Sequence, residues 1–190
     1  MPRPKTMTDT AVLEAALRLI HQQGPQALTF DSLSKICGLS GSTLVQRFGT
    51  KAALKQAALH HAWDTLDDRT AALAASVDKT PDGAVDLLVG LSMDYGGIES
   101  YAEGLLVLRE DLSDPALRAR GAAWKAALSG ALDDCLASSP EFAEGAGMML
   151  AAQWQGSLLW WSFEPDLPVQ DQVRQALSAL VVALGRRQAG

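Results

Sequence analysis

Helix-capping and helix-breaking residues divide this chain into short segments along its whole length. Within each segment apolar residues recur every three or four positions, and the alternation of polar and apolar residues that marks a half-buried strand is absent. Gly24-Pro25 ends the first segment, and Thr29, Ser40 and Thr50 each stand directly before a later one, where a hydroxyl can cap a helix. The pattern therefore predicts an all-α fold of about nine helices.

Prolines mark the starts of several later helices. Proline in the first turn of a helix costs no hydrogen bond, and Pro81, Pro115 and Pro140 each open a segment in this way. Pro165 and Pro168 interrupt the chain before the last segment. With these limits the expected helices cover roughly residues 9–23, 30–37, 41–47, 51–76, 81–95, 98–111, 115–137, 140–160 and 169–187.

Apolar spacing predicts which side chains of the first three helices pack inward. Apolar residues at i, i+3, i+4 and i+7 lie on one side of a helix, and that side faces the core. The expected inner faces are Leu13, Ala16, Leu17 and Ile20 in the first helix, Leu33, Ile36 and Cys37 in the second, and Leu44 and Phe48 in the third.

The segment from Ser34 to Leu44 has the spacing of a helix-turn-helix. Two helices that cross steeply need a small residue where they touch, and Ser34 is such a residue. Four residues later Gly38 suits a turn that requires positive φ, and six residues after that Leu44 can anchor the second helix. Because Ser, Gly and Leu are common residues, the sequence around this spacing decides what it means.

The run from Val12 to Leu54 resembles the DNA-binding head of the tetracycline-repressor (TetR) family. One helix precedes the motif and a long helix follows it directly, which is also the order in that family. The matching residues are Ala15, Ala16, Leu19, Ile20, Gly24, Thr29, Leu33, Gly38, Leu39, Ser40, Thr43, Leu44, Phe48, Lys51 and Leu54.

This resemblance implies a helix-turn-helix DNA-binding domain over residues 1–54 and a ligand-binding and dimerisation domain over residues 55–190. It implies a homodimeric repressor that occupies double-stranded operator DNA until a small-molecule effector releases it, although activation instead of repression stays open. A shift of the long helix over residues 51–76 would pass ligand binding on to the recognition helices. The resemblance implies no cofactor.

One departure from the family keeps a second interpretation open. The family usually carries tyrosine where this chain has Val45, and often histidine where it has Arg47. Valine retains only apolar contact, for example with a thymine methyl group. The alternative is therefore a helical ligand-binding or scaffold dimer that has lost specific DNA binding.

The resemblance places a recognition helix, residues 41–47, in the major groove. Gln46 suits an adenine edge, and Arg47 suits guanine or phosphate. Lys51 stands at a helix start, where a cation is slightly unfavourable unless an anion such as phosphate binds there. The expected DNA-contacting residues, with two from the N-terminal arm, are Arg3, Lys5, Thr29, Ser40, Gly41, Ser42, Thr43, Val45, Gln46, Arg47 and Lys51.

The C-terminal part contains no motif of comparable specificity. Aromatic and Met side chains suit an apolar or flat ligand, although each of them equally suits a plain core. The candidate pocket residues are Met93, Tyr95, Tyr101, Trp124, Met148 and Trp154. The last two helices would form a four-helix bundle with those of a second copy. The expected dimer-interface residues are Leu158, Trp161, Val173, Leu177, Leu180, Val181 and Leu184.

Charge is divided unevenly along the chain. The formal net charge is −6, but residues 1–51 hold six basic and three acidic side chains, whereas the remainder holds ten basic and nineteen acidic ones. A basic head on an acidic body can approach DNA if the body faces away. Glu103, Glu110 and Asp111 are interpreted as a solvated acidic face in preference to a cation site.

Other classes of protein find little support. The sequence has no glycine-rich phosphate loop, no HExxH arrangement and no metal-ligand cluster, and the adjacent His60 and His61 point in different directions on a helix. We therefore expect neither an enzyme nor a metal site. Cys37 and Cys135 are expected as reduced thiols of a cytoplasmic protein. No signal peptide is expected, because no apolar run follows the slightly basic start, and no membrane span is expected, because no apolar stretch reaches about 18 residues without charges.

Overall fold

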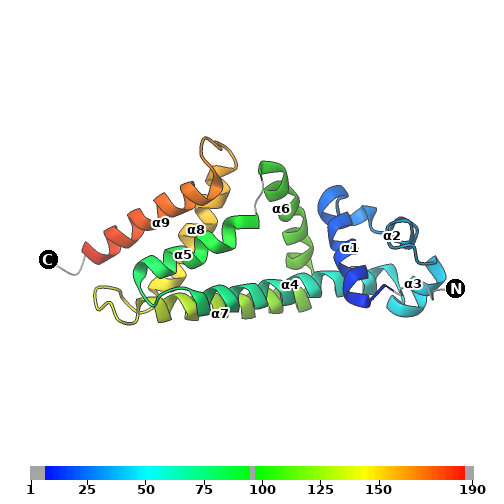
Figure 1. Ribbon diagram of the computed structural model, residues 1–190, viewed down its shortest axis with the longest axis horizontal. Coiled ribbons are helices and arrows are strands. Elements are labelled where there is room, and N and C mark those ends of the chain that lie inside the picture. The colour runs from blue at the N-terminus through cyan, green and yellow to red at the C-terminus, as the bar shows by residue number, and fades with distance from the viewer. Residues whose placement is uncertain (1–6, 95–96, 187–190) are drawn as a thin grey trace. The chain divides into compact units, whose positions relative to one another are not determined.

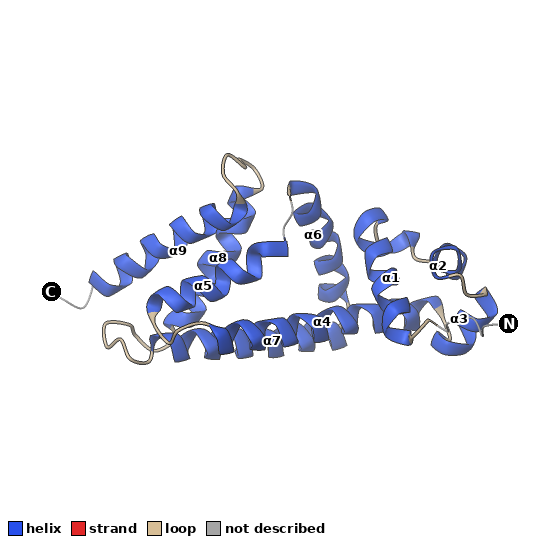
Figure 2. Cartoon of the chain, in the orientation of Figure 1, coloured by secondary structure: helices blue, strands red, loops and turns tan. Residues whose placement is uncertain are grey.

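The computed structural model describes residues 7–94 and 97–186, and these residues form helices and no strand (Figure 2). The prediction of an all-α fold is confirmed. No helix in the described ranges has the length and hydropathy that crossing a membrane requires. Within this part of the chain the nine α helices are α1 (Asp9–Gln23), α2 (Phe30–Cys37), α3 (Gly41–Phe48), α4 (Lys51–Ser76), α5 (Pro81–Leu91), α6 (Ile98–Ser113), α7 (Pro115–Leu136), α8 (Ala146–Trp161) and α9 (Val169–Arg186), with short 3₁₀ turns at Pro25–Ala27 and Ser92–Asp94.

The described residues divide into two compact units. The head unit comprises residues up to Thr65 together with Ala102–Gly121, and the body unit comprises Leu66–Tyr101 and the residues from Ala122 onward. Helix α4 contributes to both units, since it runs through the division between Thr65 and Leu66. The proposed functional boundary after Leu54 stays a prediction, because it concerns DNA binding and not compactness.

The head unit is built around one apolar cluster to which α1, α2, α3 and the start of α4 all contribute. Each fully buried Leu or Ile in such a cluster stabilises the fold by about 1.5–3 kcal/mol relative to an exposed side chain. The buried members are Val12, Ala15, Ala16, Leu19, Ile20, Leu28, Leu33, Leu44, Leu54 and Ala58.

Two details of the expected inner faces differ from the structure. In α1 the buried stripe is centred on Val12, Ala16 and Leu19, so that Leu13 and Leu17 lie at its edge and are only partly buried. In α2 the assignment of Ile36 to the inner face was wrong, because its side chain is 51% exposed. Helix α2 is only eight residues long and fully buries a single side chain, that of Leu33.

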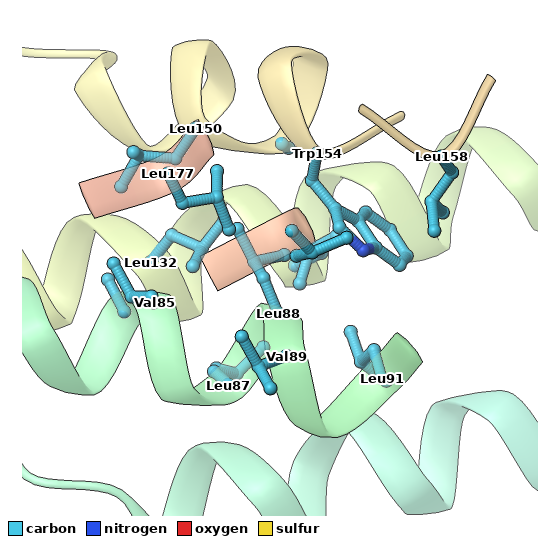
Figure 3. Packing of buried hydrophobic residues seen from close by; sticks show 14 of the residues in the cluster. Val85, Leu87, Leu88, Val89, Leu91, Leu132, Leu150, Trp154, Leu158 and Leu177 are labelled. Carbon is cyan, nitrogen blue, oxygen red and sulfur yellow. The ribbon is translucent and has the colours of Figure 1, made fainter. Parts of the chain in front are cut away.

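The body unit places α5 in the centre of its core, where seven of the eleven residues are buried. Helices α8 and α9 lie beside each other and both pack against α5 (Figure 1). Figure 3 shows Leu88 of α5 close to Leu177 of α9 and Trp154 of α8. Apolar side chains from α7 complete the cluster, among them Leu128 and Leu132.

Two expected helix ends were wrong. Helix α8 begins at Ala146 instead of Pro140, because residues 139–144 form turns and Gly145 takes the left-handed conformation at the helix start, with φ 81°. Gly145 has no side chain with which to cap this helix. The amide of Gly147 instead donates to the Asp133 carboxylate of α7 at 2.8 Å. Helix α5 ends at Leu91 and continues as a 3₁₀ turn, although the pattern predicted helix to residue 95.

The turn between α2 and α3 yields a stability prediction. Gly38 has φ 64°, and an added Cβ would meet no atom within 4 Å, so only backbone strain opposes a side chain there. We expect Gly38→Ala to lower the free energy of unfolding by about 1–2 kcal/mol in urea titrations. Gly104→Ala is the matched control, because Gly104 lies inside α6 with equal space. It should raise stability by about 0.5–1 kcal/mol. Equal effects of both variants would contradict the assigned strain.

Candidate nucleic-acid interface

The predicted helix-turn-helix is present, and its turn has the expected conformation. Gly38 ends α2 in the left-handed region, and its amide donates to the Ser34 carbonyl at 2.9 Å. Ser40 then begins α3, because its hydroxyl accepts from the Thr43 amide at 3.1 Å. Leu44 is fully buried in the head core, as its expected role as an anchor requires.

A reciprocal capping box fixes the start of α2. The Thr29 hydroxyl accepts from the Ser32 amide at 3.0 Å, and the Ser32 hydroxyl accepts from the Thr29 amide at 3.0 Å. The Ser32 hydroxyl also lies 2.8 Å from the Ala27 carbonyl, to which it can donate. Thr29 is therefore confirmed as a cap, while its contact with phosphate stays a prediction.

The outward side of α3 is polar but uncharged. Ser42, Val45 and Gln46 are exposed, and Val45 leaves 46% of its surface free. The Ser40 hydroxyl lies 2.9 Å from that of Ser42 and 2.8 Å from that of Thr43, so three hydroxyls gather at the helix start. Hydroxyls and amides can read base edges or hold phosphate oxygens, and valine methyls can meet a thymine methyl. Gly41 and Thr43 are half-buried.

Arg47 differs from the other residues of α3 that were expected to contact DNA. Its guanidinium pairs with the Asp9 carboxylate in the first turn of α1, with Nε donating at 2.6 Å. The arginine side chain is 21% exposed, and it also lies over the Phe48 ring, with Cζ 5.8 Å from the ring centre. In this structure Arg47 is thus engaged within the head.

Lys51 is the first residue of α4 and is exposed. Thr50 caps this helix, because its hydroxyl accepts from the Ala53 amide at 3.1 Å. The Lys51 ammonium donates to the Gln26 carbonyl at 3.3 Å, a long contact that a phosphate oxygen can replace. An exposed ammonium beside a helix N-terminus is a suitable arrangement for an anion. Arg3 and Lys5 lie outside the described residues.

Part of the expected ligand pocket forms an aromatic group in the body unit. The rings of Trp124 and Trp154 are 6.3 Å apart, and Tyr101 meets Trp161 edge to face at 6.5 Å. Trp154 is buried, and its indole N–H donates to the Ser92 hydroxyl at 2.8 Å.

The two methionine candidates lie at the surface of the described structure. Met93 and Met148 are exposed, and Tyr95 lies outside the described residues. Trp124 also borders an open cavity of about 430 Å³ between α4 and α7. The other residues that line it are Asp67, Thr70, Ala71, Ala74, Ala123, Ala127 and Ala131.

The residues predicted at a dimer interface divide into two groups. Leu158, Trp161, Val173 and Leu177 are buried in the core of the chain itself, so they cannot form the outer surface that meets a second copy. Leu180, Val181 and Leu184 are half-buried. Leu158 and Trp161 belong to α8, which is apolar on every side, so that its periodicity does not show which stripe faces the chain's own core. Val173 and Leu177 belong to the broad apolar face of α9, and their part of that face packs into the same core. The exposed side of α8 instead carries Met149, Leu159 and Trp160.

Sequence reasoning missed a polar connection within the head unit between α4 and the α6–α7 segment. Lys55 pairs with Glu110, and the Gln56 amide donates to Asp114 at 3.0 Å. Asp111, expected on a solvated face, is buried and accepts from the Trp63 indole N–H at 3.2 Å. The sequence around Asp111 gives no indication that this residue is buried, because its hydrogen-bond partner Trp63 lies 48 residues away.

Burial raises the pKa of the Asp111 carboxyl, while the Trp63 hydrogen bond opposes the shift. The folded state therefore holds this proton more tightly than the unfolded chain. The resulting stabilisation is complete below the ordinary Asp pKa and is lost as the pH rises through the folded pKa. Above the folded pKa the ionised, buried carboxylate is a cost to folding.

Asp111→Asn imitates the protonated carboxyl and still accepts from Trp63. We expect it to raise the Tm at neutral pH, by roughly 2–4 °C if the cost is about 1 kcal/mol, and to have no effect near pH 3. Asp114→Asn is a control of opposite sign, since the Ala116 backbone amide and Gln56 lower the pKa of Asp114. It should lower the Tm at neutral pH. A pH-independent difference for Asp111→Asn would contradict this account.

No group of three metal-ligating side chains comes together within residues 7–94 and 97–186. Residues 12–58 match the family model of bacterial regulatory proteins of the tetR family. No curated protein sequence matches the chain significantly.

Solved structures share the fold along nearly the whole chain. A transcriptional regulator from Rhodococcus sp. Rha1 has a TM-score of 0.74 at 18% identity, covering 95% of this chain and 97% of that one. A protein from Saccharomonospora viridis, solved in complex with choline, has a TM-score of 0.70 at 20% identity, covering 90% and 93%. The multidrug binding protein EbrR, complexed with malachite green, has a TM-score of 0.65 at 20% identity, covering 93% and 98%.

Proposed function

We propose that this chain, which carries the DNA-binding head of the TetR family, is a ligand-responsive repressor that binds operator DNA as a homodimer. The resemblance predicted from the Val12–Leu54 run is confirmed by the family match. The observation that carries the proposal is the left-handed turn at Gly38, which leads into a capped and exposed α3. That geometry suits a recognition helix entering a major groove.

Recognition of base edges and attraction of phosphate groups are assigned to different residues. Ser42, Val45 and Gln46 offer a hydroxyl, methyl groups and an amide to base edges. Lys51 at the α4 N-terminus attracts phosphate, and Thr29 can add a second phosphate contact at the start of α2. The basic arm with Arg3 and Lys5 is proposed to reach the backbone or the minor groove.

Helix α8 supports the proposed dimer. Its sixteen residues, all of them described, include no charged side chain, and its exposed side includes Met149, Trp160 and the neighbouring Phe163. Trp160 and Phe163 are each 71% exposed, and their rings are 6.0 Å apart. An apolar patch of this kind is a usual feature of a protein–protein interface. We therefore propose that the outer side of α8, together with exposed residues of α9 such as Val182, meets a second copy.

The aromatic group around Trp124 and Trp154 supports a flat or apolar effector bound in the body unit. A structure of this fold that contains malachite green, an aromatic dye, is consistent with such a ligand. Helix α4 belongs to the head and also packs in the body, so it is the proposed route of coupling. Coupling requires that the ligand prefer the conformation that does not bind DNA.

Selection from random double-stranded DNA by the purified chain tests the central proposal. We expect a palindromic sequence to be enriched and its affinity to fall steeply with salt concentration. Weak and sequence-blind binding would overturn operator binding. It would then favour a ligand-binding dimer that has lost it, as the departure at Val45 suggests.

Lys51→Gln should weaken binding to every sequence by the same factor. Since one phosphate contact is lost, the slope of log affinity against log salt concentration should fall by about one. Lys125→Gln on α7, another exposed lysine, is the matched control and should leave the slope unchanged. An unchanged slope for Lys51→Gln would exclude the proposed phosphate contact.

Gln46→Ala should act on one base pair of each half-site. We expect a loss of about 1–3 kcal/mol against the preferred base and nearly equal affinity for all four bases at that position. Titrations with four operators that differ only at that position measure the effect. A uniform loss at all positions would show that Gln46 contacts the backbone instead.

Trp160→Glu tests the dimer, because it places a charge in the proposed apolar interface. We expect sedimentation velocity to show a monomer under conditions in which the unaltered chain is a dimer. Leu112→Glu on α6 is the control, since Leu112 is a similarly exposed apolar residue outside α8 and α9. A dimer that survives Trp160→Glu but not Leu112→Glu would move the interface to α6.

A further inference from the structure

The Arg47–Asp9 ion pair connects two helices that are distant in sequence. Two donors of the Arg47 guanidinium, Nε and Nη2, converge on the Asp9 Oδ1 atom, with Nε at 2.6 Å. The third nitrogen, Nη1, is buried and has no hydrogen-bond partner among the described residues. The contact thus joins the last turn of α3 to the first turn of α1.

Apolar packing alone holds α3 weakly. The helix has eight residues, and Leu44 is its one fully buried side chain, with Phe48 partly buried beside it. A short helix anchored along so narrow a stripe can roll about its own axis with little loss of apolar contact. Such a roll would redirect Ser42, Val45 and Gln46 together. The Arg47–Asp9 pair opposes it, because α1 is fixed by five buried residues.

The charges of the pair suit their places in the two helices. Asp9 lies in the first turn of α1, where a negative charge is favoured, and Arg47 lies in the last turn of α3, where a positive charge is favoured. Because the guanidinium is largely removed from solvent, loss of the Asp9 charge would leave a half-buried cation without its partner. Both helix ends therefore favour the pair, in which the Asp9 side chain keeps 66% of its surface exposed.

We propose that Arg47 is a positioning residue: it orients the recognition helix through Asp9, and the uncharged residues Ser42, Val45 and Gln46 read the bases. This proposal rests on the proposed operator binding. In it, Arg47 acts within the protein instead of contacting guanine or phosphate, the role predicted from its place in the motif.

A double-mutant cycle separates positioning from DNA contact. The proteins are the unaltered chain, Asp9→Asn, Arg47→Gln and the double variant, each titrated with the selected operator at several salt concentrations. We expect each single change to weaken binding roughly three- to tenfold. The double change should be no worse than either one, and the salt slope should be unchanged.

A direct phosphate contact gives the opposite pattern. Arg47→Gln would then lower the salt slope by about one, and Asp9→Asn would leave affinity unchanged or increase it by freeing the arginine. Arg47→Lys sharpens the distinction, because lysine keeps the charge but loses the planar donor pair. If Arg47 acts by positioning α3, Arg47→Lys should bind the operator as weakly as Arg47→Gln does. Near-normal binding by Arg47→Lys would overturn the proposal.

The Asp31–Lys35 pair of α2 is the matched control. It is an exposed i, i+4 pair that stays within one helix, with an N–O distance of 2.8 Å. Asp31→Asn and Lys35→Gln should show no coupling in the same cycle, and the base preferences should stay the same. Coupling of equal size in both cycles would mean that general electrostatics, not orientation of α3, explains the result.

A measurement without DNA keeps this proposal separate from operator binding. In amide NMR spectra of the free protein, Asp9→Asn and Arg47→Gln should move the signals of residues 41–46 in the same directions, while the α2 control variants leave them in place. Unmoved α3 signals in Asp9→Asn would overturn the positioning role whether or not an operator exists. Moved signals without any selected operator would retain that role and refute the proposed function instead.

Discussion

Helix α4 must serve two hydrophobic cores, and the rest of the structure depends on this constraint. Leu54 and Ala58 at its start complete the core of the head, whereas Leu66 and Leu73 further along pack against the core of the body. Each core is close-packed, so a shift of the α4 segment that it contains would disturb the apolar contacts of that core. The polar contacts of Lys55, Gln56 and Trp63 add to its fixation within the head.

The sequence predicted those parts of the fold that depend on neighbouring residues. A hydroxyl cap bonds to an amide only three residues further along the chain, and a left-handed glycine ends a helix by its own conformation. The capping roles of Thr29 and Ser40 and the turn at Gly38 could therefore be predicted from their positions alone. The start of α8 could not be predicted in this way, because the amide of Gly147 in its first turn donates to Asp133 of another helix. The same reason hid the burial of Asp111, because long-range partners have no local pattern.

The candidate site was predictable to a similar degree. The location of α3 and its exposed residues followed from the motif, because an amphipathic helix of known register has a known outer side. The engagement of Arg47 did not follow, since Asp9 precedes it by 38 residues. In α8 the difficulty was different: Leu158 and Trp160 are both large and apolar, and only the packed structure shows that the first is buried and the second exposed.

The uncharged outer side of α3 has a consequence for the proposed operator binding when the ion concentration inside a cell changes. Attraction to the phosphate backbone weakens as ions accumulate, but hydrogen bonds and methyl contacts with base edges respond little to ionic strength. When water leaves a cell during osmotic stress, a regulator with the proposed contacts would occupy less DNA in total. Its preference for one sequence over another would nevertheless persist, because the residues Ser42, Val45 and Gln46 carry no charge that salt can screen.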